Sequence, residues 1–290
     1  MHDNEFPINV ELVRSLVRTK FDPGQEFEVT AVDSEGTDNA LYRVGGRLVA
    51  RFPRIESASL NVRREWEWLG RLAGRFKLSI PEPVHFGEPG ATFPWPWILT
   101  SWIDGECARA DDPGLRGAAD DLGAFIVEMH AVAPEGAPRS PRGGNLVDRD
   151  EATRRALAKC GRWINVEGAL AEWDRALSAT VEAVPEVMVH GDLAPGNVIV
   201  RDGHVVGVID FSTITLGDGA CDFMVAWNLL DAAARRQLRL VSEVDEATWL
   251  RGRGWALSVA ALQLPYYATR NRALAANSRR VFAELAADPE

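Results

Sequence analysis

The first hundred residues alternate between short apolar runs and helical repeats. Valines and leucines between Val10 and Val17 recur on one helix face, which predicts an opening amphipathic helix. Short segments of alternating apolar and polar residues follow, a pattern typical of strands with one buried face. The expected strands are residues 27–32, 40–44, 47–52, 84–86 and 97–103, and a second helix is expected over residues 57–76. Gly45-Gly46 predicts a tight turn between the second and third strands.

Long helical repeats dominate from Asp104 onward. The expected helices cover residues 115–132, 151–163, 168–184 and 248–264. Residues 134–145 are rich in proline and glycine, which predicts a loop. One β segment, residues 187–211, interrupts the helices, and its Asp202-Gly203 is a strong hairpin signal.

These patterns together predict an α+β protein of two parts. Residues 1–103 are expected to form a β-rich lobe, and residues 104–290 a larger, mainly helical lobe. A length of 290 residues is enough for two such lobes around real hydrophobic cores. Ligand sites are common where two such parts meet.

Charge and cysteine usage narrow the possible partners. The chain carries 32 Lys and Arg against 42 Asp and Glu, a net charge of −10. This balance disfavours nucleic acid and anionic membranes as partners and favours a cationic ligand. The longest uncharged stretch, residues 254–269, contains Pro265 and is shorter than the ~20 residues that span a bilayer. Three cysteines without a CxxC pair, and an acidic start that does not resemble a signal peptide, indicate a cytoplasmic protein.

The residues from His190 to Asn197 carry the strongest chemical signal. They read HGDLAPGN, and the hairpin that follows leads to Asp210 in the segment IDFS. Phosphoryl transfer needs a carboxylate to orient the acceptor hydroxyl, a role that Asp192 can fill. It also needs hard oxygen ligands for Mg²⁺, which Asn197 and Asp210 can supply because a hairpin returns both to one end.

This arrangement resembles the catalytic and metal-binding loops of protein kinases, in which H-x-D-x-x-x-x-N is followed by a hairpin and D-F. The His-Gly-Asp-Leu form with Pro195 is more similar to the aminoglycoside phosphotransferase family of small-molecule kinases. The resemblance implies a two-lobed protein-kinase-like fold with a small antiparallel β-sheet in the N-terminal lobe. It also implies ATP or GTP as phosphoryl donor, Mg²⁺ as cofactor, and transfer to an aminoglycoside-type antibiotic, which confers resistance.

The resemblance assigns further roles by position. Ser34, Gly36 and Thr37 fall in the nucleotide loop between the first two strands. Arg51 falls on the phosphate-binding strand, and Glu65 falls where a glutamate pairs with that strand's cation. The remaining positions lie in the hinge that would offer backbone groups to the adenine: Ser101 and Ile103.

Structural roles are the simpler interpretation for some conspicuous polar residues. The ring of His190 is expected to fix the loop backbone by hydrogen bonds rather than to act as a base. Asp222 is expected to accept hydrogen bonds from the catalytic loop, and Asp218 to cap the helix that begins near Ala220.

Two departures from the kinase pattern keep alternatives open. Arg51 stands where protein kinases have lysine, and Ser212 replaces the glycine of D-F-G. The A-P-E segment and a G-x-G-x-x-G loop are also missing, which disfavours a protein substrate. The alternatives are a metabolite kinase with a sugar, amino alcohol or macrolide acceptor, and a nucleotide-binding module without turnover. The sequence leaves open the acceptor, the modified hydroxyl, the preference for ATP or GTP, and the oligomeric state.

Overall fold

The chain divides into two compact units. The computed structural model describes residues 5–21, 24–33, 38–110, 112, 115–179 and 184–288. The first unit comprises Met1–Gly105 and Gly207–Ser212, and the second comprises Glu106–Val206 and Thr213–Glu290. The expected boundary at residue 103 assigned residues 207–212 to the helical lobe. This short segment packs with the first unit instead. It does so because Gly207 forms a parallel bridge with Ser79, and the Val208 amide donates to the Ser79 carbonyl at 3.0 Å.

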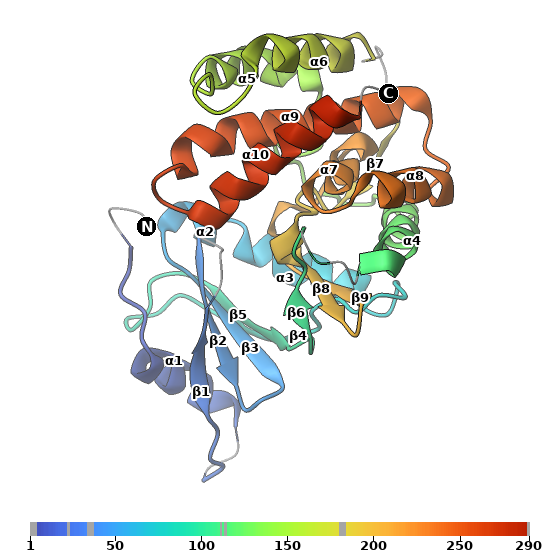
Figure 1. Ribbon diagram of the computed structural model, residues 1–290. Helices are drawn as coiled ribbons and strands as arrows, with labels where there is room; N and C mark the ends of the chain where they lie inside the picture. Colours follow the sequence, from blue (N-terminus) through green and yellow to red (C-terminus); the bar gives the residue numbers. More distant parts are fainter. Residues whose placement is uncertain are drawn as a thin grey trace. The chain divides into compact units, whose positions relative to one another are not determined.

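An antiparallel five-stranded sheet with the order β1-β2-β3-β5-β4 organises the first unit (Figure 1). Its elements are α1 (Val10–Val17), a 3₁₀ turn (Arg18–Lys20), β1 (Val29–Val32), β2 (Asn39–Val44), β3 (Leu48–Pro53), α2 (Glu56–Ser59), α3 (Val62–Leu72), β4 (Pro83–Gly87) and β5 (Trp97–Ser101). The five expected strands and the opening helix are confirmed. Gly45 and Gly46 have φ values of 58° and 77°, the left-handed backbone that a two-residue hairpin turn requires.

The single helix expected over residues 57–76 is wrong, because the segment forms two helices. The Ser59 hydroxyl donates to the Glu56 carbonyl at 2.6 Å, and the chain then turns before α3 begins. Serine side chains compete in this way with the helical hydrogen bonds of the backbone. At the break, Leu60 is 75% exposed, so no packing holds a continuous helix there.

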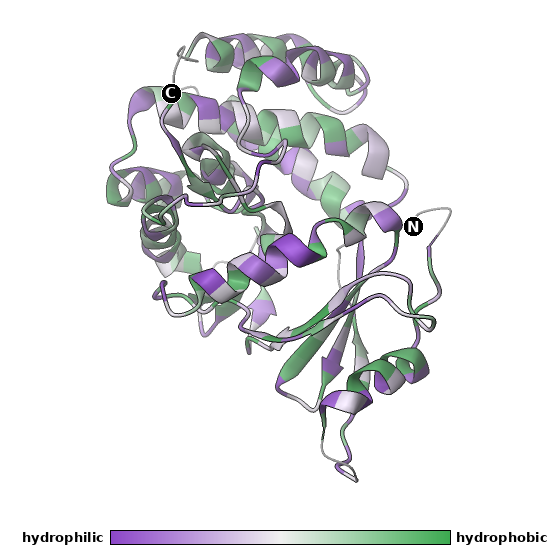
Figure 2. Ribbon diagram, turned by 180° about the vertical axis from the view of Figure 1, so that it is seen from behind, coloured by the Kyte–Doolittle hydropathy of each residue, from purple (hydrophilic) through white to green (hydrophobic). Residues whose placement is uncertain are grey.

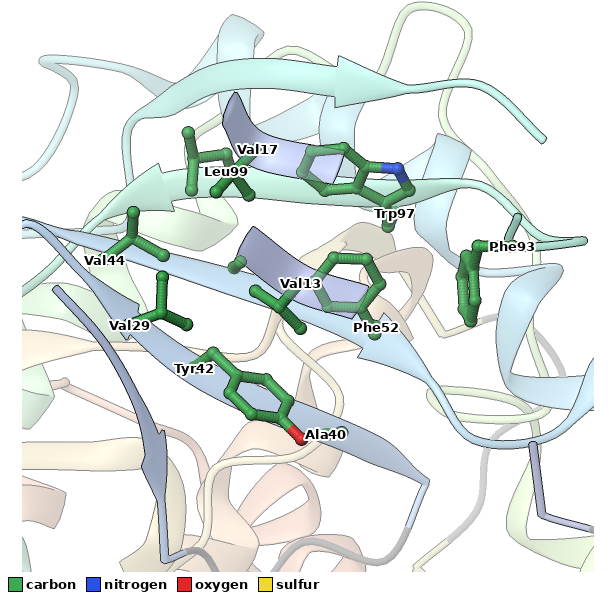
Figure 3. Close-up of a cluster of buried hydrophobic side chains, with 11 residues drawn as sticks. Val13, Val17, Val29, Ala40, Tyr42, Val44, Phe52, Phe93, Trp97 and Leu99 are labelled. Atoms are coloured by element: carbon green, nitrogen blue, oxygen red, sulfur yellow. The ribbon is translucent and has the colours of Figure 1, made fainter. Parts of the chain in front are cut away.

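The hydrophobic core of the first unit lies between α1 and one face of the sheet (Figure 3). Helix α1 begins where the Asn9 side chain accepts a hydrogen bond from the Leu12 amide at 2.9 Å. Its Val13 and Val17 are fully buried against the cluster, in which Phe52 of β3 stacks on Trp97 at 4.9 Å between ring centroids. Figure 2 shows hydrophobic and hydrophilic residues mixed along α1 and the strands, as expected for elements with one buried face.

Alternation along β3 decides which side chain faces the chemistry. Ala50 and Phe52 are buried in this cluster, so Arg51 points to the opposite face of the sheet. Helix α3 presents Glu65 to Arg51 on that side.

The second unit is mainly helical. The helices and strands from Glu106 onward are β6 (Glu106–Cys107), α4 (Ala118–His130), α5 (Asp150–Leu157), α6 (Val166–Ser178), β7 (Glu186–Val189), β8 (Val198–Arg201), β9 (His204–Val208), β10 (Thr215–Asp218), α7 (Val225–Asn228), α8 (Ala232–Val241), α9 (Glu246–Tyr267) and α10 (Arg272–Ala287). They belong to this unit except for the last two residues of β9, which belong to the first unit. Short 3₁₀ segments lie at Leu115–Gly117, Leu146–Arg149, Pro195–Asn197, Phe211–Thr213 and Gly219–Met224. Strands β10 and β7 form an antiparallel pair, and β6, β8 and β9 form a small sheet.

The four expected helices of this unit are confirmed, with shifted ends; residues 180–183 of the helix expected over 168–184 lie outside the described residues. The predicted hairpin is confirmed too: Asp202 and Gly203 have φ values of 53° and 79°. Strands β6 and β10 were not predicted from the sequence. Helices α8 and α10 were not predicted either, although Asp231 and Asn271 cap their first turns. In the described part of the chain, none of the helices combines the length and apolar character needed to cross a membrane.

We expect Phe52→Ala to destabilise the first unit by about 3–5 kcal/mol, because it removes a fully buried ring from the centre of the cluster. Urea unfolding followed by tryptophan fluorescence measures this loss. Leu60→Ala is the control, and it should change the free energy of unfolding by less than about 0.5 kcal/mol because Leu60 is exposed. Equal effects of the two substitutions would contradict the assigned core.

Candidate active site

Arg51 joins two carboxylates on the face of the sheet opposite the core. Its NH1 donates to Glu65 Oε1 at 2.8 Å, and its NH2 donates to Asp210 Oδ1 at 2.8 Å. The side chains of Arg51 and Glu65 are 12% and 3% exposed, and that of Asp210 is 32% exposed. The structure thus contains the expected Arg51–Glu65 pair and adds Asp210 to it, which makes one ion network of three side chains.

A planar guanidinium explains how arginine can occupy this position. With its amide oxygen turned towards Arg51, Asn39 accepts hydrogen bonds from Nε at 3.2 Å and from NH2 at 2.9 Å. Arginine can present several N–H groups in a fixed fork, whereas lysine presents a single point charge. Burial works against the charge of Arg51, but Asp210 and Glu65 outweigh it and hold the pKa of Arg51 above its ordinary value.

Asp210 is held in an unusual backbone conformation. Its φ is 65°, in the left-handed region that non-glycine residues rarely adopt. The Ser212 hydroxyl and amide donate to Asp210 Oδ1 at 2.6 and 3.3 Å, beside the Arg51 contact at the same oxygen. These three contacts fix the orientation of the Asp210 carboxylate, a hard oxygen group of the kind that metal ions such as Mg²⁺ prefer.

Glu65 is buried with only one of its oxygens engaged. Oε1 accepts from Arg51 and also from the Phe211 amide at 3.1 Å, whereas Oε2 is buried without a hydrogen-bond partner among the described residues. Burial raises the pKa of Glu65 to about 7; Arg51 lowers it in part, and the Asp210 charge raises it further. One arginine therefore serves two carboxylates.

The loop that carries Asp192 is fixed by its backbone. Asp222 accepts hydrogen bonds from the amides of His190 and Gly191 at 3.0 and 2.8 Å, and His190 Nδ1 accepts from the Asp192 amide at 3.2 Å. The structural roles predicted for His190 and Asp222 are confirmed. Asp218 accepts from the Ala220 amide at 3.0 Å, as expected of a cap. Its pairing with buried Arg251 at 2.7 Å was not predicted.

Both oxygens of the Asp192 carboxylate have a partner in the second unit. The Asn197 side-chain amide donates to Asp192 Oδ2 at 3.2 Å and to the Asp192 carbonyl at 2.9 Å. Arg142 NH2 lies 3.2 Å from Oδ1. Because Asn197 uses its amide nitrogen here, its side-chain oxygen is left as the possible metal ligand.

The sequence did not predict a role for Arg142. This residue lies in the proline- and glycine-rich segment predicted as a loop, and the two glycines that follow it were the available signal of a close backbone approach.

The structure describes only some of the residues expected around the nucleotide. Ser34, Gly36 and Thr37 lie outside the described residues. The Ser101 amide donates to the Glu82 carbonyl at 2.9 Å, so only the Ser101 carbonyl can serve an adenine. The Ile103 side chain packs beside Gly207, where a Cβ would come within 3.0 Å of it.

The oxygens of Asn197 and Asp210 fit the preferences of Mg²⁺. The described residues contain no group of three or more His, Cys, Asp or Glu side chains that could hold a metal. Mg²⁺ does not need such a group, because it keeps several waters and binds substrate phosphates through one or two protein oxygens. The amide oxygen of Asn197 and the carboxylate of Asp210 are each a hard ligand of this type.

Comparison with known proteins identifies relatives. The chain matches the phosphotransferase enzyme family over residues 29–255. It is 29% identical over 189 residues to an aminoglycoside 3'-phosphotransferase of Escherichia coli, a match that covers 59% of this chain and 62% of that relative, less than two thirds of it.

Two solved structures show the same fold. The GDP and kanamycin complex of APH(2")-IIia has a TM-score of 0.73 at 19% identity, covering 95% of this chain and 98% of that one. Macrolide 2'-phosphotransferase type I has a TM-score of 0.62 at 18% identity, covering 93% and 95%. The predicted protein-kinase-like α+β fold, with an antiparallel sheet in the N-terminal part and helices in the C-terminal part, is confirmed.

The raised pKa of Glu65 predicts a pH-dependent stability. Between its unfolded pKa near 4.5 and its folded pKa of about 7, the folded state binds more protons than the unfolded state. The free energy of unfolding should therefore fall as the pH rises through this window, by up to about 3 kcal/mol.

Glu65→Gln cannot titrate, so the stability of the wild type relative to this variant should fall between pH 4.5 and 7 and stay level above it. Urea unfolding of both proteins at a series of pH values measures the difference. If the difference in free energy of unfolding between the two proteins stayed constant from pH 4.5 to 7, Glu65 would have the same pKa in the folded and unfolded states, which would contradict the prediction.

Proposed function

Because this chain belongs to the phosphotransferase enzyme family, we propose that it transfers the γ-phosphoryl group of a nucleoside triphosphate to a hydroxyl group of a small molecule. The main support for the proposal is the environment of the Asp192 carboxylate. It is 29% exposed, its loop is fixed by Asp222, and Asn197 holds one of its oxygens. A carboxylate that is both fixed and accessible suits a group that must orient an acceptor hydroxyl.

Asp192 orients the acceptor hydroxyl and takes its proton. The hydroxyl oxygen forms the new bond to the γ-phosphorus, and the bond from this phosphorus to the bridging oxygen breaks. The nucleoside diphosphate leaves with that oxygen. This chemistry depends mainly on positioning and on compensation of phosphate charge.

Asn197 and Asp210 are the proposed Mg²⁺ ligands, through the amide oxygen of Asn197 and the carboxylate of Asp210. Bound Mg²⁺ supplies positive charge to the phosphate oxygens. Arg51 and Ser212 donate to Asp210 Oδ1, which keeps the carboxylate oriented.

The nucleotide contacts follow from family membership. Ser34, Gly36, Thr37 and Arg51 are proposed for the phosphates, with Glu65 positioning Arg51. The Ser101 carbonyl and the Ile103 backbone are proposed for the adenine. The similarity to a GDP complex supports a purine nucleotide, ATP or GTP.

An aminoglycoside-type antibiotic is the first candidate acceptor. The curated relative is an aminoglycoside phosphotransferase, and one similar structure contains kanamycin. The net charge of −10 suits a polycationic acceptor.

A less cationic acceptor, such as a macrolide, is the second candidate, and the arginines of the second unit favour it. Arg142 already pairs with Asp192. Arg149 donates to Ser258 Oγ at 2.9 Å and stacks on Trp255 at 4.6 Å, but it contacts no carboxylate among the described residues. Burial, and then the neighbouring charge of Arg142, lower the pKa of Arg149 to about 10. Uncompensated positive charge in the unit of Asp192 disfavours a polycation, and one similar structure is a macrolide phosphotransferase.

A panel of aminoglycosides, macrolides, sugars and amino alcohols, each tested with ATP and with GTP, separates these candidates. Release of nucleoside diphosphate that depends on the acceptor supports the proposal, and phosphorylated product in the mass spectrum identifies the acceptor. Nucleotide binding without turnover on any acceptor would favour the nucleotide-binding module instead. Growth on aminoglycosides or macrolides after expression of the chain tests resistance.

Asp192→Ala should lower kcat by ~10²–10⁴ and leave nucleotide affinity nearly unchanged, because it removes the proton acceptor but no nucleotide ligand. Steady-state kinetics with the accepted substrate, and calorimetric titration of the nucleotide, measure the two quantities. The control is Asp148→Ala, an exposed aspartate of the same unit, which should retain full activity. Full activity of Asp192→Ala would remove Asp192 from the catalytic role.

A further inference from the structure

We infer that Arg142 is a positioning residue for phosphoryl transfer, acting through the Asp192 carboxylate; this inference rests on the proposed function. Arg142 NH2 lies 3.2 Å from Asp192 Oδ1. It is the one cationic side chain that pairs with Asp192 among the described residues. The motif His190–Asn197 contains neither lysine nor arginine, so the positive charge comes from a distant segment of the chain.

The segment that carries Arg142 is fixed to the strand β10. The Leu216 amide donates to the Pro138 carbonyl at 3.0 Å, and the Asp218 amide donates to the Gly143 carbonyl at 2.7 Å. Between these contacts, the Ser140 amide donates to Thr215 Oγ1 at 2.9 Å. Backbone hydrogen bonds on both sides of Arg142 therefore hold its Cα in place.

Two glycines allow this close approach. A Cβ on Gly217 would lie 2.2 Å from the Gly143 carbonyl oxygen, and a Cβ on Gly191 would lie 3.0 Å from Arg142 Cβ. Gly191 has a φ of 81°, which also favours glycine. Gly191 stands directly before Asp192. The loop that carries Asp192 therefore lies against the Cβ of Arg142, at a point where a side chain on residue 191 would not fit.

Two donors, Asn197 and Arg142, hold the two oxygens of the Asp192 carboxylate. Asn197 holds Oδ2 and Arg142 holds Oδ1, so the plane of the carboxylate is defined from both ends. Each oxygen keeps an accepting position for the substrate hydroxyl. Without Arg142 the carboxylate could rotate about its χ2 bond, and a misplaced base slows transfer without weakening nucleotide binding.

The test compares Arg142→Ala and Arg142→Lys with the wild type. We expect kcat to fall about 10- to 100-fold in Arg142→Ala, with unchanged nucleotide affinity and unchanged melting temperature. Arg142→Lys should recover part of kcat, and added guanidinium ion at non-denaturing concentration should partly rescue Arg142→Ala. The matched control is Arg139→Ala in the same segment: Arg139 is 62% exposed, pairs with Glu186, and should be dispensable for kcat with or without guanidinium.

Each outcome decides the inference. A kcat of Arg142→Ala equal to that of the wild type would overturn it. A lower kcat that comes with a lower melting temperature, and that neither lysine nor guanidinium restores, would also overturn it, because Arg142 would then be a purely structural residue. Absence of transfer by the wild type on every acceptor would overturn the proposed function itself, and this inference with it.

Discussion

The ion network of Arg51, Glu65 and Asp210 is the constraint on which the first unit depends. It ties β3, α3 and the segment after β9 together through one guanidinium, at contact distances of 2.8 Å. Removing a cation from a buried network leaves its carboxylates uncompensated, which is strongly destabilising. The same contacts hold Asp210 at a positive φ. Structural stability and the placement of the proposed metal ligand are therefore properties of one interaction.

In the second unit, backbone hydrogen bonds fix the loop that carries Asp192. Asp222 accepts hydrogen bonds from two consecutive amides of the loop that carries Asp192, and glycines at 191 and 217 let the segment of Arg142 approach this loop closely. The Asp192 side chain therefore extends from a backbone with little freedom. A charged network orients one aspartate, and a hydrogen-bonded loop orients the other.

The sequence predicted the five strands of the first unit, the hairpin of β8 and β9, most of the helices and the roles of His190 and Asp222, because most of these follow from local periodicity or from a contiguous motif. It did not predict the contact of Arg51 with Asp210, since 159 positions separate the two residues and no local pattern records such a contact. Arg142 was missed for the same reason: its segment reads as an ordinary loop until β10 pairs with it. The break at Ser59 was missed because a side-chain hydrogen bond overrode a helical pattern.

The central claim is that Asp210, held by Arg51, binds the metal of a metal–nucleotide complex. Calorimetric titration of a non-hydrolysable nucleotide, with and without Mg²⁺, tests it most directly in the wild type, Asp210→Asn and Asp192→Asn. The account predicts that Mg²⁺ tightens nucleotide binding in the wild type and in Asp192→Asn by about tenfold or more, and has little effect in Asp210→Asn. An equal effect of Mg²⁺ in all three proteins would contradict it.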